Sequence, residues 1–223
     1  MTTASRDLEV SLARRWGIVA GMDEVGRGAL AGPVAVGVAL VSVEAEPVPE
    51  GLTDSKALTP RRREALVEPV RSWALDSSVG YASPREIDQW GIIAALRLAG
   101  RRALADVAGR GLVPGGVLLD GSHDWLSAPD DLFGAFGGPE DPFGRELPVH
   151  MQVKADASCA AVAAASVLAK VARDRLMQDL DDPGYGWASN KGYGSAAHAR
   201  AIVELGVSDH HRRSWKMPTQ ATK

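Results

Sequence analysis

The chain has 223 residues, of which 45% are hydrophobic. This is enough for one large domain or two small ones with a substantial core, and it excludes an intrinsically disordered chain. The single cysteine, Cys159, excludes an internal disulfide and a zinc site built from several thiolates. The chain has no run of about 18 uncharged apolar residues and begins with a polar, acidic segment. We therefore expect a soluble, cytoplasmic protein without a membrane segment.

The net charge of −3 hides an uneven distribution along the chain. Residues 1–119 carry 14 basic and 14 acidic side chains, whereas residues 120–156 carry two basic and eight acidic ones. Residues 183–223 carry six basic and two acidic side chains. Such asymmetry suits a protein that gathers cations at one place and meets a polyanion at another. A solvated acidic loop and an ordinary basic C-terminus explain it equally well.

The first half of the chain predicts strands and helices in alternation. Apolar runs at 17–22 and 33–41, joined by a glycine-rich connection, predict two antiparallel strands. Thr59 is a suitable N-cap, and Pro60 a suitable first residue, for a helix that Pro69 is expected to kink or shorten.

The rest of the chain continues this alternation. A strand at 77–83 leads into Ser83-Pro84-Arg85-Glu86, a capping-box sequence that begins a helix to about residue 107. The remaining predicted elements are strands at 116–120 and 147–153, an alanine-rich helix at about 158–180, and a helix at 195–205. This order predicts an α/β fold with a five-stranded mixed sheet.

Three segments have no predicted helix or strand. Residues 121–146 are rich in Gly, Pro and Asp, and so long a loop inside a compact domain is either functional or mobile. We expect residues 1–16 to be a flexible N-terminal segment and residues 216–223 to be a tail. The sequence therefore predicts one domain over residues 17–215.

Four carboxylates lie at the ends of predicted strands. Asp23 and Glu24 follow the first strand, Asp120 ends the fourth, and Asp156 comes just after the fifth. Functional sites of open α/β sheets collect at strand ends, and carboxylates crowded within about 4–6 Å stay ionised only beside cations. Two divalent ions about 3.5–4 Å apart are the usual device for phosphodiester hydrolysis. Each acidic residue alone is more typical of a cap or a solvated turn; the set indicates a metal site.

The segment GMDEVGRGALAGPVAVGV at 21–38 resembles the signature of ribonuclease HII, the bacterial type 2 ribonuclease H. Further blocks similar to that family follow in the family's order, so the resemblance extends over about residues 17–215. They are TDSKAL (53–58), LLDG (118–121), VKADA with AAASVLAKVARD (153–174), YGWASNKGYGSAAH (185–198) and DHHRRSW (209–215). The resemblance implies a ribonuclease H-like fold, with a five-stranded mixed sheet flanked by helices and a C-terminal helical region.

The resemblance also implies an activity. Ribonuclease HII is an endonuclease that cleaves the RNA strand of RNA·DNA hybrids and the 5′ side of ribonucleotides embedded in DNA duplexes. It leaves 5′-phosphate and 3′-hydroxyl ends and takes part in removing ribonucleotides from DNA. The expected cofactors are two divalent ions, Mg²⁺ or Mn²⁺. The expected partner is a hybrid or a ribonucleotide-containing duplex. We expect the protein to be a monomer and to have no membrane partner.

The family's functional residues fall on matching positions of this sequence. The four catalytic carboxylates, which are also its metal ligands, correspond to Asp23, Glu24, Asp120 and Asp156. The substrate-binding residues correspond to Gly26, Arg27, Gly28 and Tyr193. The two glycines let the backbone approach a 2′-hydroxyl, the group that distinguishes RNA from DNA. The arginine between them presents a fork to a phosphate, and the tyrosine presents a flat face to a deoxyribose.

Other polar residues have two interpretations each. Lys56 and Lys191 are predicted to contact the nucleic-acid backbone, although an exposed lysine is an equally good interpretation. Ser166, among alanines, either binds a phosphate or hydrogen-bonds back to its own helix, and we favour the structural role. Three histidines lack the accompanying ligands of a metal site and are expected to contact phosphate or lie on the surface: His198, His210 and His211.

Two other functions fit the sequence less well, and one position differs from the family's sequence pattern. Ribonuclease HIII carries an additional N-terminal substrate-binding domain, for which the 22 residues before Asp23 are too few. A catalytically inactive nucleic-acid-binding module would not need all four carboxylates. Where the family commonly has the pattern I-D-x-x-N-I, this chain has IDQWGI at 87–92, so Gly91 replaces the asparagine and no polar substrate contact is expected there.

Overall fold

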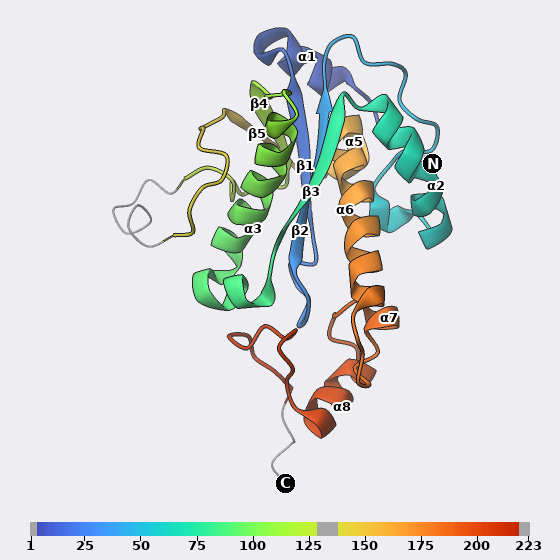
Figure 1. Ribbon diagram of the computed structural model, residues 1–223. Helices are drawn as coiled ribbons and strands as arrows, with labels where there is room; N and C mark the ends of the chain where they lie inside the picture. Colours follow the sequence, from blue (N-terminus) through green and yellow to red (C-terminus); the bar gives the residue numbers. More distant parts are fainter. Residues whose placement is uncertain (1–3, 129–137, 219–223) are drawn as a thin grey trace.

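The computed structural model describes residues 4–128 and 138–218 (Figure 1). Its strands form one sheet in the order β3-β2-β1-β4-β5. They are β1 (Val19–Val25), β2 (Val34–Val41), β3 (Asp76–Ala82), β4 (Gly116–Asp120) and β5 (Val149–Gln152). The first three strands pair antiparallel, whereas β4 pairs parallel with both β1 and β5. The predicted five-stranded mixed sheet is confirmed.

Helices cover both faces of the sheet (Figure 1). They are α1 (Asp7–Trp16), the 3₁₀ turn η1 (Ser55–Ala57), α2 (Pro60–Trp73), α3 (Pro84–Gly109), α5 (Ala155–Ser158), α6 (Ala160–Asp179), α7 (Trp187–Asn190) and α8 (Ala196–Leu205). Helix α3 packs on one face of the sheet, α2 and α6 pack on the other, and α7 and α8 extend beyond one end of it. Among the described residues, no helix is long and apolar enough to span a membrane.

The helix starts follow the predicted capping residues. The Thr59 hydroxyl accepts a hydrogen bond from the Arg62 amide at the start of α2, and Ser83 and Glu86 form a reciprocal capping box at the start of α3. Helix α2 continues past Pro69 to Trp73, so this proline does not shorten it as predicted. In α3, Gly91 has a φ of 77° and breaks the helical geometry.

The N-terminal segment, for which the sequence predicted no helix or strand, contains α1. The Glu9 side chain of this helix is buried, and its Oε1 accepts a hydrogen bond from the Ala161 amide at 2.8 Å. Burial raises the pKa of Glu9, and the hydrogen bond from Ala161 lowers it. This carboxyl group therefore caps α6 from a distant part of the chain, because Cys159, the residue before α6, provides no side-chain cap.

The predicted alanine-rich helix is α6, and the short helix α5 precedes it, separated from it by Cys159. This residue is extended, with φ −114° and ψ 121°, and separates α5 from α6. The Ser5 amide donates to the Ser158 carbonyl, and the Ser5 carbonyl accepts from the Ala160 amide. Pairing with the N-terminal segment thus holds Cys159 in a strand-like conformation, which the local sequence does not predict.

Helix α6 lies unusually close to the sheet. A Cβ atom on Gly21 of β1 would come within 2.4 Å of the Ala161 backbone, and one on Gly37 of β2 within 2.2 Å of the Ala165 carbonyl oxygen. Such distances leave no room for a methyl group, and the alanines in the first half of α6 are fully buried. Close packing of this kind fixes the height of α6 above the strands that carry the carboxylates.

Candidate active site

The sheet places the carboxylates of β1 and β4 at one edge. These strands are parallel neighbours in which Met22 lies opposite Leu119, so Asp23 and Asp120 are the next positions along the same register. Glu24 is the following residue of β1. The parallel pairing explains why side chains separated by almost a hundred residues in sequence gather at the same place.

Asp120 also positions the fourth carboxylate. Its Oδ1 accepts a hydrogen bond of 2.7 Å from the Ala155 amide, at the start of the short helix α5. Asp156 is the next residue of that helix. The connection after β5 is thereby tied to the end of β4, and the negative charge of Asp156 is close enough to raise the pKa of Asp120.

Burial and mutual repulsion disfavour the ionised carboxylates. The pKa of Asp23 is raised to about 7 by burial, with further increases from the charges of Glu24 and Asp120, while a hydrogen bond with Ser166 lowers it. Burial is also the largest of the effects that raise the pKa values of Glu24 and Asp120. The Asp23 Oδ2 is buried without a hydrogen-bond partner in the described part of the chain.

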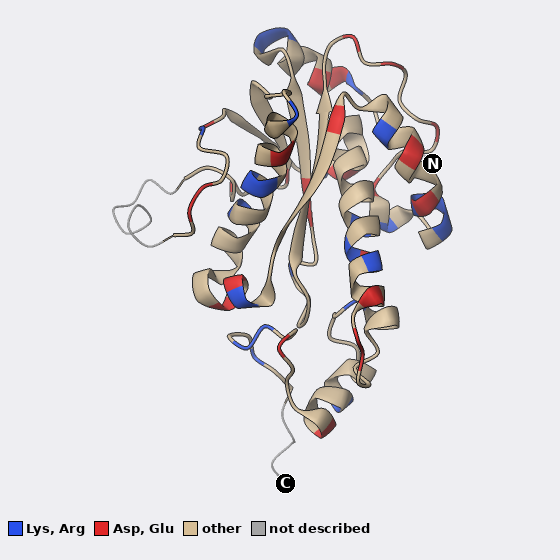
Figure 2. Cartoon of the chain, viewed as in Figure 1, with Lys and Arg blue, Asp and Glu red and all other residues tan. Residues whose placement is uncertain are grey.

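Two basic side chains neutralise part of this charge. The Lys56 ammonium lies 3.1 Å from Asp156 Oδ2, and Arg27 Nη1 lies 3.3 Å from Glu24 Oε1. Figure 2 shows acidic residues on the central strands beside basic residues on α6. Two cations paired with two of the four carboxylates leave Asp23 and Asp120 without an ion pair at this edge of the sheet.

A cleft of about 350 Å³ opens in front of these groups. Most of the sequence-predicted site residues line it, together with residues that the sequence did not indicate. The lining residues are Asp23, Glu24, Val25, Gly26, Arg27, Gly28, Ser55, Lys56, Asp120, Lys170 and Tyr193. Asp156 lies at its margin, in contact with Lys56. The carboxylates, the Gly-Arg-Gly turn and the tyrosine thus face one space.

Lys191 does not line this cleft. It has a left-handed backbone conformation with φ 53° at the end of α7, and its ammonium donates to the Ala188 carbonyl of that helix. Its own carbonyl accepts a hydrogen bond from Arg173. In the described structure Lys191 thus has a local contact with α7, and its contact with nucleic acid stays a prediction. Lys170 is a lysine of this region that lines the cleft.

The sequence analysis missed the polar face of α6. Ser166, Lys170 and Arg173 are spaced by four and three residues, so they lie on one side of a helix whose first half is otherwise apolar. The Ser166 hydroxyl is fully buried and hydrogen-bonds to the Ser55 hydroxyl at 2.8 Å, so it does not bond back to its own helix. The helical spacing of these three polar residues was a signal available in the sequence.

The residues at this edge fit a hard divalent cation by their chemistry. All four acidic side chains offer oxygen donors, and the buried Asp23 Oδ2 lacks a partner. In the described ranges, however, no three acidic, histidine or cysteine side chains stand close enough together to hold an ion as they lie. The contacts of Lys56 with Asp156 and of Arg27 with Glu24 occupy ligand atoms that a cation would need.

Two of the three histidines are buried, which corrects the expectation that they contact phosphate or lie on the surface. His211 Nδ1 accepts from the Ser208 amide at 2.9 Å, so the proton of this ring is on Nε2. His211 Nε2 lies 3.1 Å from His198 Nε2, and His198 Nδ1 lies 2.9 Å from the Tyr193 carbonyl oxygen. The hydrogen bonds thus run in one direction, from the Ser208 amide through His211 and His198 to the Tyr193 carbonyl. Each ring donates through one nitrogen and accepts through the other, so both rings are neutral in this arrangement.

This histidine pair predicts a loss of stability in mild acid. Burial, and then the neighbouring His198, lower the pKa of His211 from 6.5 to about 4. Because the unfolded chain binds this proton more readily, the free energy of unfolding should fall as the pH drops from about 6.5 to about 4, by up to ~3 kcal/mol in total. Urea unfolding across this range should show a flatter dependence for His211→Gln than for the parent. The adjacent His210→Gln serves as control, and an equally flat curve for it would contradict the assignment.

The long connection 121–146 is tied to α3 at its described ends. Trp125 is buried against that helix, and the buried Arg101 of α3 donates to Glu146 at 2.8 Å and to the Arg145 carbonyl. Figure 1 shows this connection beside α3 and β5. Residues 129–137 lie outside the described residues.

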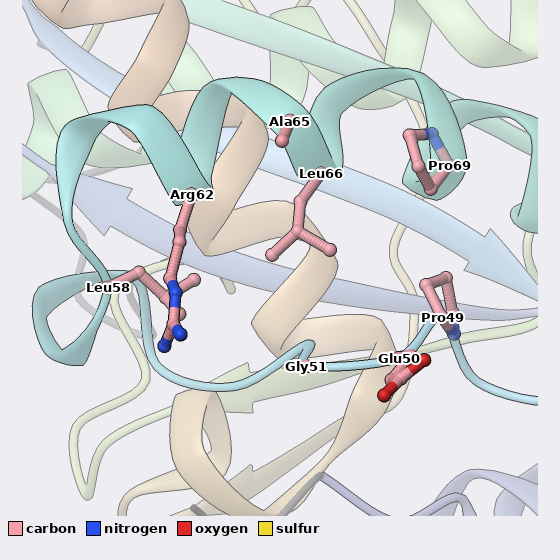
Figure 3. Close-up of a pocket in the computed structure, with 8 residues that line it drawn as sticks. All are labelled: Pro49, Glu50, Gly51, Leu58, Arg62, Ala65, Leu66 and Pro69. Carbon is pink, nitrogen blue, oxygen red and sulfur yellow. The ribbon is translucent and has the colours of Figure 1, made fainter.

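A larger hollow, of about 770 Å³, lies between residues 49–51 and α2 (Figure 3). Its walls are mainly apolar, with Arg62 and Glu50 among the lining residues. None of the sequence-predicted site residues lines it. The chemistry therefore points to the smaller, acidic cleft as the candidate active site.

Comparison with known proteins assigns the family. The sequence profile of ribonuclease HII matches residues 20–218, nearly the whole described domain. The chain belongs to the ribonuclease HII family. Ribonuclease HII of Streptomyces coelicolor is 46% identical over 215 residues, covering 96% of this chain and 82% of the relative. Ribonuclease HII of Paracoccus denitrificans is 47% identical over 199 residues, covering 88% and 84%.

Solved structures agree with the family assignment. Ribonuclease HII of Archaeoglobus fulgidus, solved in complex with PCNA, has a TM-score of 0.64 and 26% identity, covering 92% of this chain and 98% of that one. Ribonuclease H2 of Pyrococcus horikoshii has a TM-score of 0.57 and 26% identity, covering 89% and 94%. This member of the ribonuclease HII family is therefore a nuclease with ribonuclease H activity on RNA–DNA substrates, and the family depends on divalent metal ions.

Proposed function

We propose that this ribonuclease HII cleaves on the 5′ side of ribonucleotides embedded in DNA duplexes, as well as within the RNA strand of hybrids. The observation that carries the proposal is the composition of the cleft. It combines Asp23, Glu24 and Asp120 with the Gly26-Arg27-Gly28 turn and Tyr193, and Asp156 lies at its margin. One wall thus offers oxygen ligands for metal, and the other offers groups suited to a nucleotide.

The four carboxylates would hold two divalent ions, Mg²⁺ or Mn²⁺. Bound there, the ions would supply an activated water and stabilise the leaving oxygen of the phosphodiester. The charge agrees with this number, because four carboxylates carry −4 and two divalent ions carry +4. The protein's own part is to hold the ligands together, which the parallel pairing of β1 with β4 and the bond from Ala155 to Asp120 support.

When metal ions bind, the basic side chains of the cleft would exchange their carboxylate partners for phosphates of the nucleic acid. In the described structure Lys56 and Arg27 neutralise Asp156 and Glu24. Once divalent ions supply the positive charge, both side chains become available to the nucleic-acid backbone, and Lys170 lines the same cleft. These lysines and the arginine are therefore proposed as phosphate contacts.

The opposite wall supports discrimination of the sugar. The Tyr193 ring is 37% exposed and lies 5.5 Å from the Arg173 guanidinium and 5.9 Å from the Lys170 ammonium. The exposed part of this tyrosine offers an apolar surface that suits a deoxyribose beside the ribonucleotide. The Gly-Arg-Gly turn would bind the 2′-hydroxyl through its main chain.

The experiment compares two DNA duplexes that differ by a single ribonucleotide. With Mg²⁺ or Mn²⁺, we expect one nick on the 5′ side of the ribonucleotide, leaving 3′-hydroxyl and 5′-phosphate ends, and no nick in the all-deoxy duplex. Chelation of the metal should abolish cleavage. Cleavage restricted to long hybrids would contradict the proposal, and binding without any nick in either substrate would support a binding module instead.

A further inference from the structure

Beneath the Gly-Arg-Gly turn lies a buried arginine that no carboxylate neutralises. Arg212 is fully buried and comes from the segment after α8. Its Nη2 donates to the Gly26 carbonyl at 2.7 Å, its Nη1 to the Arg27 carbonyl at 2.8 Å, and its Nε and Nη2 to the Gly32 carbonyl at 3.2 and 3.1 Å. Within the described residues, no carboxylate lies at ion-pair distance from it.

A second buried arginine, Arg173 of α6, lies beside the first. It donates to the carbonyls of Ala31, Pro33 and Lys191 at 2.8–3.1 Å. Burial and the nearby charge of Arg173 lower the pKa of Arg212 to about 9. Burying two guanidinium groups against carbonyl oxygens alone is costly, so this arrangement calls for a functional reason.

The hydrogen bonds of Arg212, together with one from the Ala29 amide to the Gly26 carbonyl at 3.2 Å, determine which way the turn's amides face. All peptide bonds of the described chain are trans, so each carbonyl points away from the amide that follows it. The carbonyls of Gly26 and Arg27 point at Arg212. The N–H groups of Arg27 and Gly28 must therefore point to the opposite side, toward the cleft that these residues line. Neither amide donates to a protein acceptor in the described part of the chain.

Arg173 restrains the same turn by contact. Gly26 has a φ of 83°, and a Cβ atom at this position would lie 2.0 Å from Arg173 Nε. The glycine is thus required both by its backbone conformation and by the close approach of the guanidinium. The turn is held by hydrogen bonds from one arginine and by packing against the other, which leaves its amides little freedom to rotate.

We infer that Arg212 is a positioning residue for ribonucleotide discrimination, because it aims the free amides of Arg27 and Gly28 at the oxygen atoms of the bound ribonucleotide. Its guanidinium also polarises these peptide groups and makes them stronger donors. The inference deepens the proposed function and rests on it. It assigns the orientation of the discriminating amides to a side chain nearly two hundred residues away in sequence.

The test uses Arg212→Lys, which keeps the positive charge but cannot donate to three carbonyls with the planar fork of arginine. Arg213→Lys is the matched control, because Arg213 is exposed and pairs only with Asp209 through its side chain. Both are made in an Asp23→Asn background so that substrate is not consumed. The measurement is the ratio of dissociation constants for an all-deoxy duplex and the same duplex with one ribonucleotide, at one salt concentration with Mg²⁺.

We expect the Asp23→Asn parent and the Arg213→Lys control to prefer the ribonucleotide duplex. In Arg212→Lys, the ratio of the two dissociation constants should be about tenfold smaller. A general loss of folded protein would weaken both dissociation constants equally and leave their ratio unchanged. A folded Arg212→Lys protein with an unchanged ratio would overturn the inference while leaving the proposed function intact. A parent without preference would overturn both.

A second measurement does not depend on the folding of the variant. In the parent protein, the backbone amide resonances of Arg27 and Gly28 should shift, and their hydrogen exchange should slow, when the ribonucleotide duplex is added. The all-deoxy duplex should produce a smaller effect at equal saturation. Equal responses of both amides to the two duplexes would show that they do not read the ribonucleotide and would overturn the inference.

Discussion

Replacing Asp23 by asparagine is expected to lower kcat/KM for a ribonucleotide-containing duplex by at least about a thousandfold, because it removes a ligand of the proposed metal site. Asp23 is the most buried of the four carboxylates, and its Oδ2 has no hydrogen-bond partner among the described residues. An amide keeps the shape of the side chain but offers only one neutral oxygen donor. Cleavage rates measured over a range of Mg²⁺ and Mn²⁺ concentrations check this expectation.

The same substitution should not unfold the protein. The pKa of Asp23 is raised to about 7 by burial, so its ionised form is disfavoured in the folded protein without metal. Asparagine avoids that charge, and we expect the melting temperature of Asp23→Asn in chelator to equal or exceed that of the wild type. Asp106→Asn, on the exposed end of α3, is the control for activity. An active Asp23→Asn enzyme, or one that loses activity only because it unfolds, would refute the metal-ligand role.

Substituting Gly37 with alanine is expected to destabilise the core strongly although it adds only one methyl group. The added methyl group would come within 2.2 Å of the Ala165 carbonyl oxygen, which is a backbone atom of α6 and cannot rotate away. We expect the free energy of unfolding to fall by ~3 kcal/mol, which corresponds to a melting temperature lower by roughly 6–12 °C for a domain of this size.

The matched control for this prediction is Gly109→Ala. Gly109 is the last residue of α3, and no atom lies within 4 Å of the Cβ that alanine would add. Alanine is favoured over glycine in helices, so the melting temperature of this variant should be unchanged or slightly higher. Similar melting temperatures for Gly37→Ala and the wild type would mean that α6 does not lie as close to β2 as described.

Local sequence patterns were sufficient to predict the sheet and most helix starts. Apolar runs and turn residues act over a few neighbouring positions, and the capping box at Ser83 satisfies backbone groups of its own helix. Sequence patterns also placed Asp23, Asp120 and Asp156 at strand ends. The parallel order of β1, β4 and β5 then brings strand ends to one edge regardless of the length of the connections.

Several features depend on contacts between distant segments and were predicted wrongly or missed. The extended conformation of Cys159 between α5 and α6 was missed, because it depends on the pairing of Ser5 with the residues that flank Cys159. His198 and His211 are buried because their rings hydrogen-bond to each other, although histidines in a basic segment are typical of a surface. The bond from the Lys191 ammonium to the Ala188 carbonyl of α7, and the left-handed backbone of Lys191, were also missed.

The sequence by itself therefore determined the α/β class, the strands, the capped helices and the acidic residues, since each depends on periodicity or on neighbours in the chain. Only the tertiary structure showed which side chains hold the Gly-Arg-Gly turn of the cleft in place. Arg212 and Arg173 reach the Gly-Arg-Gly turn and its neighbours across more than a hundred residues. The sequence does not indicate whether an arginine side chain contacts solvent, a phosphate or a buried carbonyl. Only the folded chain distinguishes these partners, because burial and hydrogen-bond geometry arise when distant segments pack together.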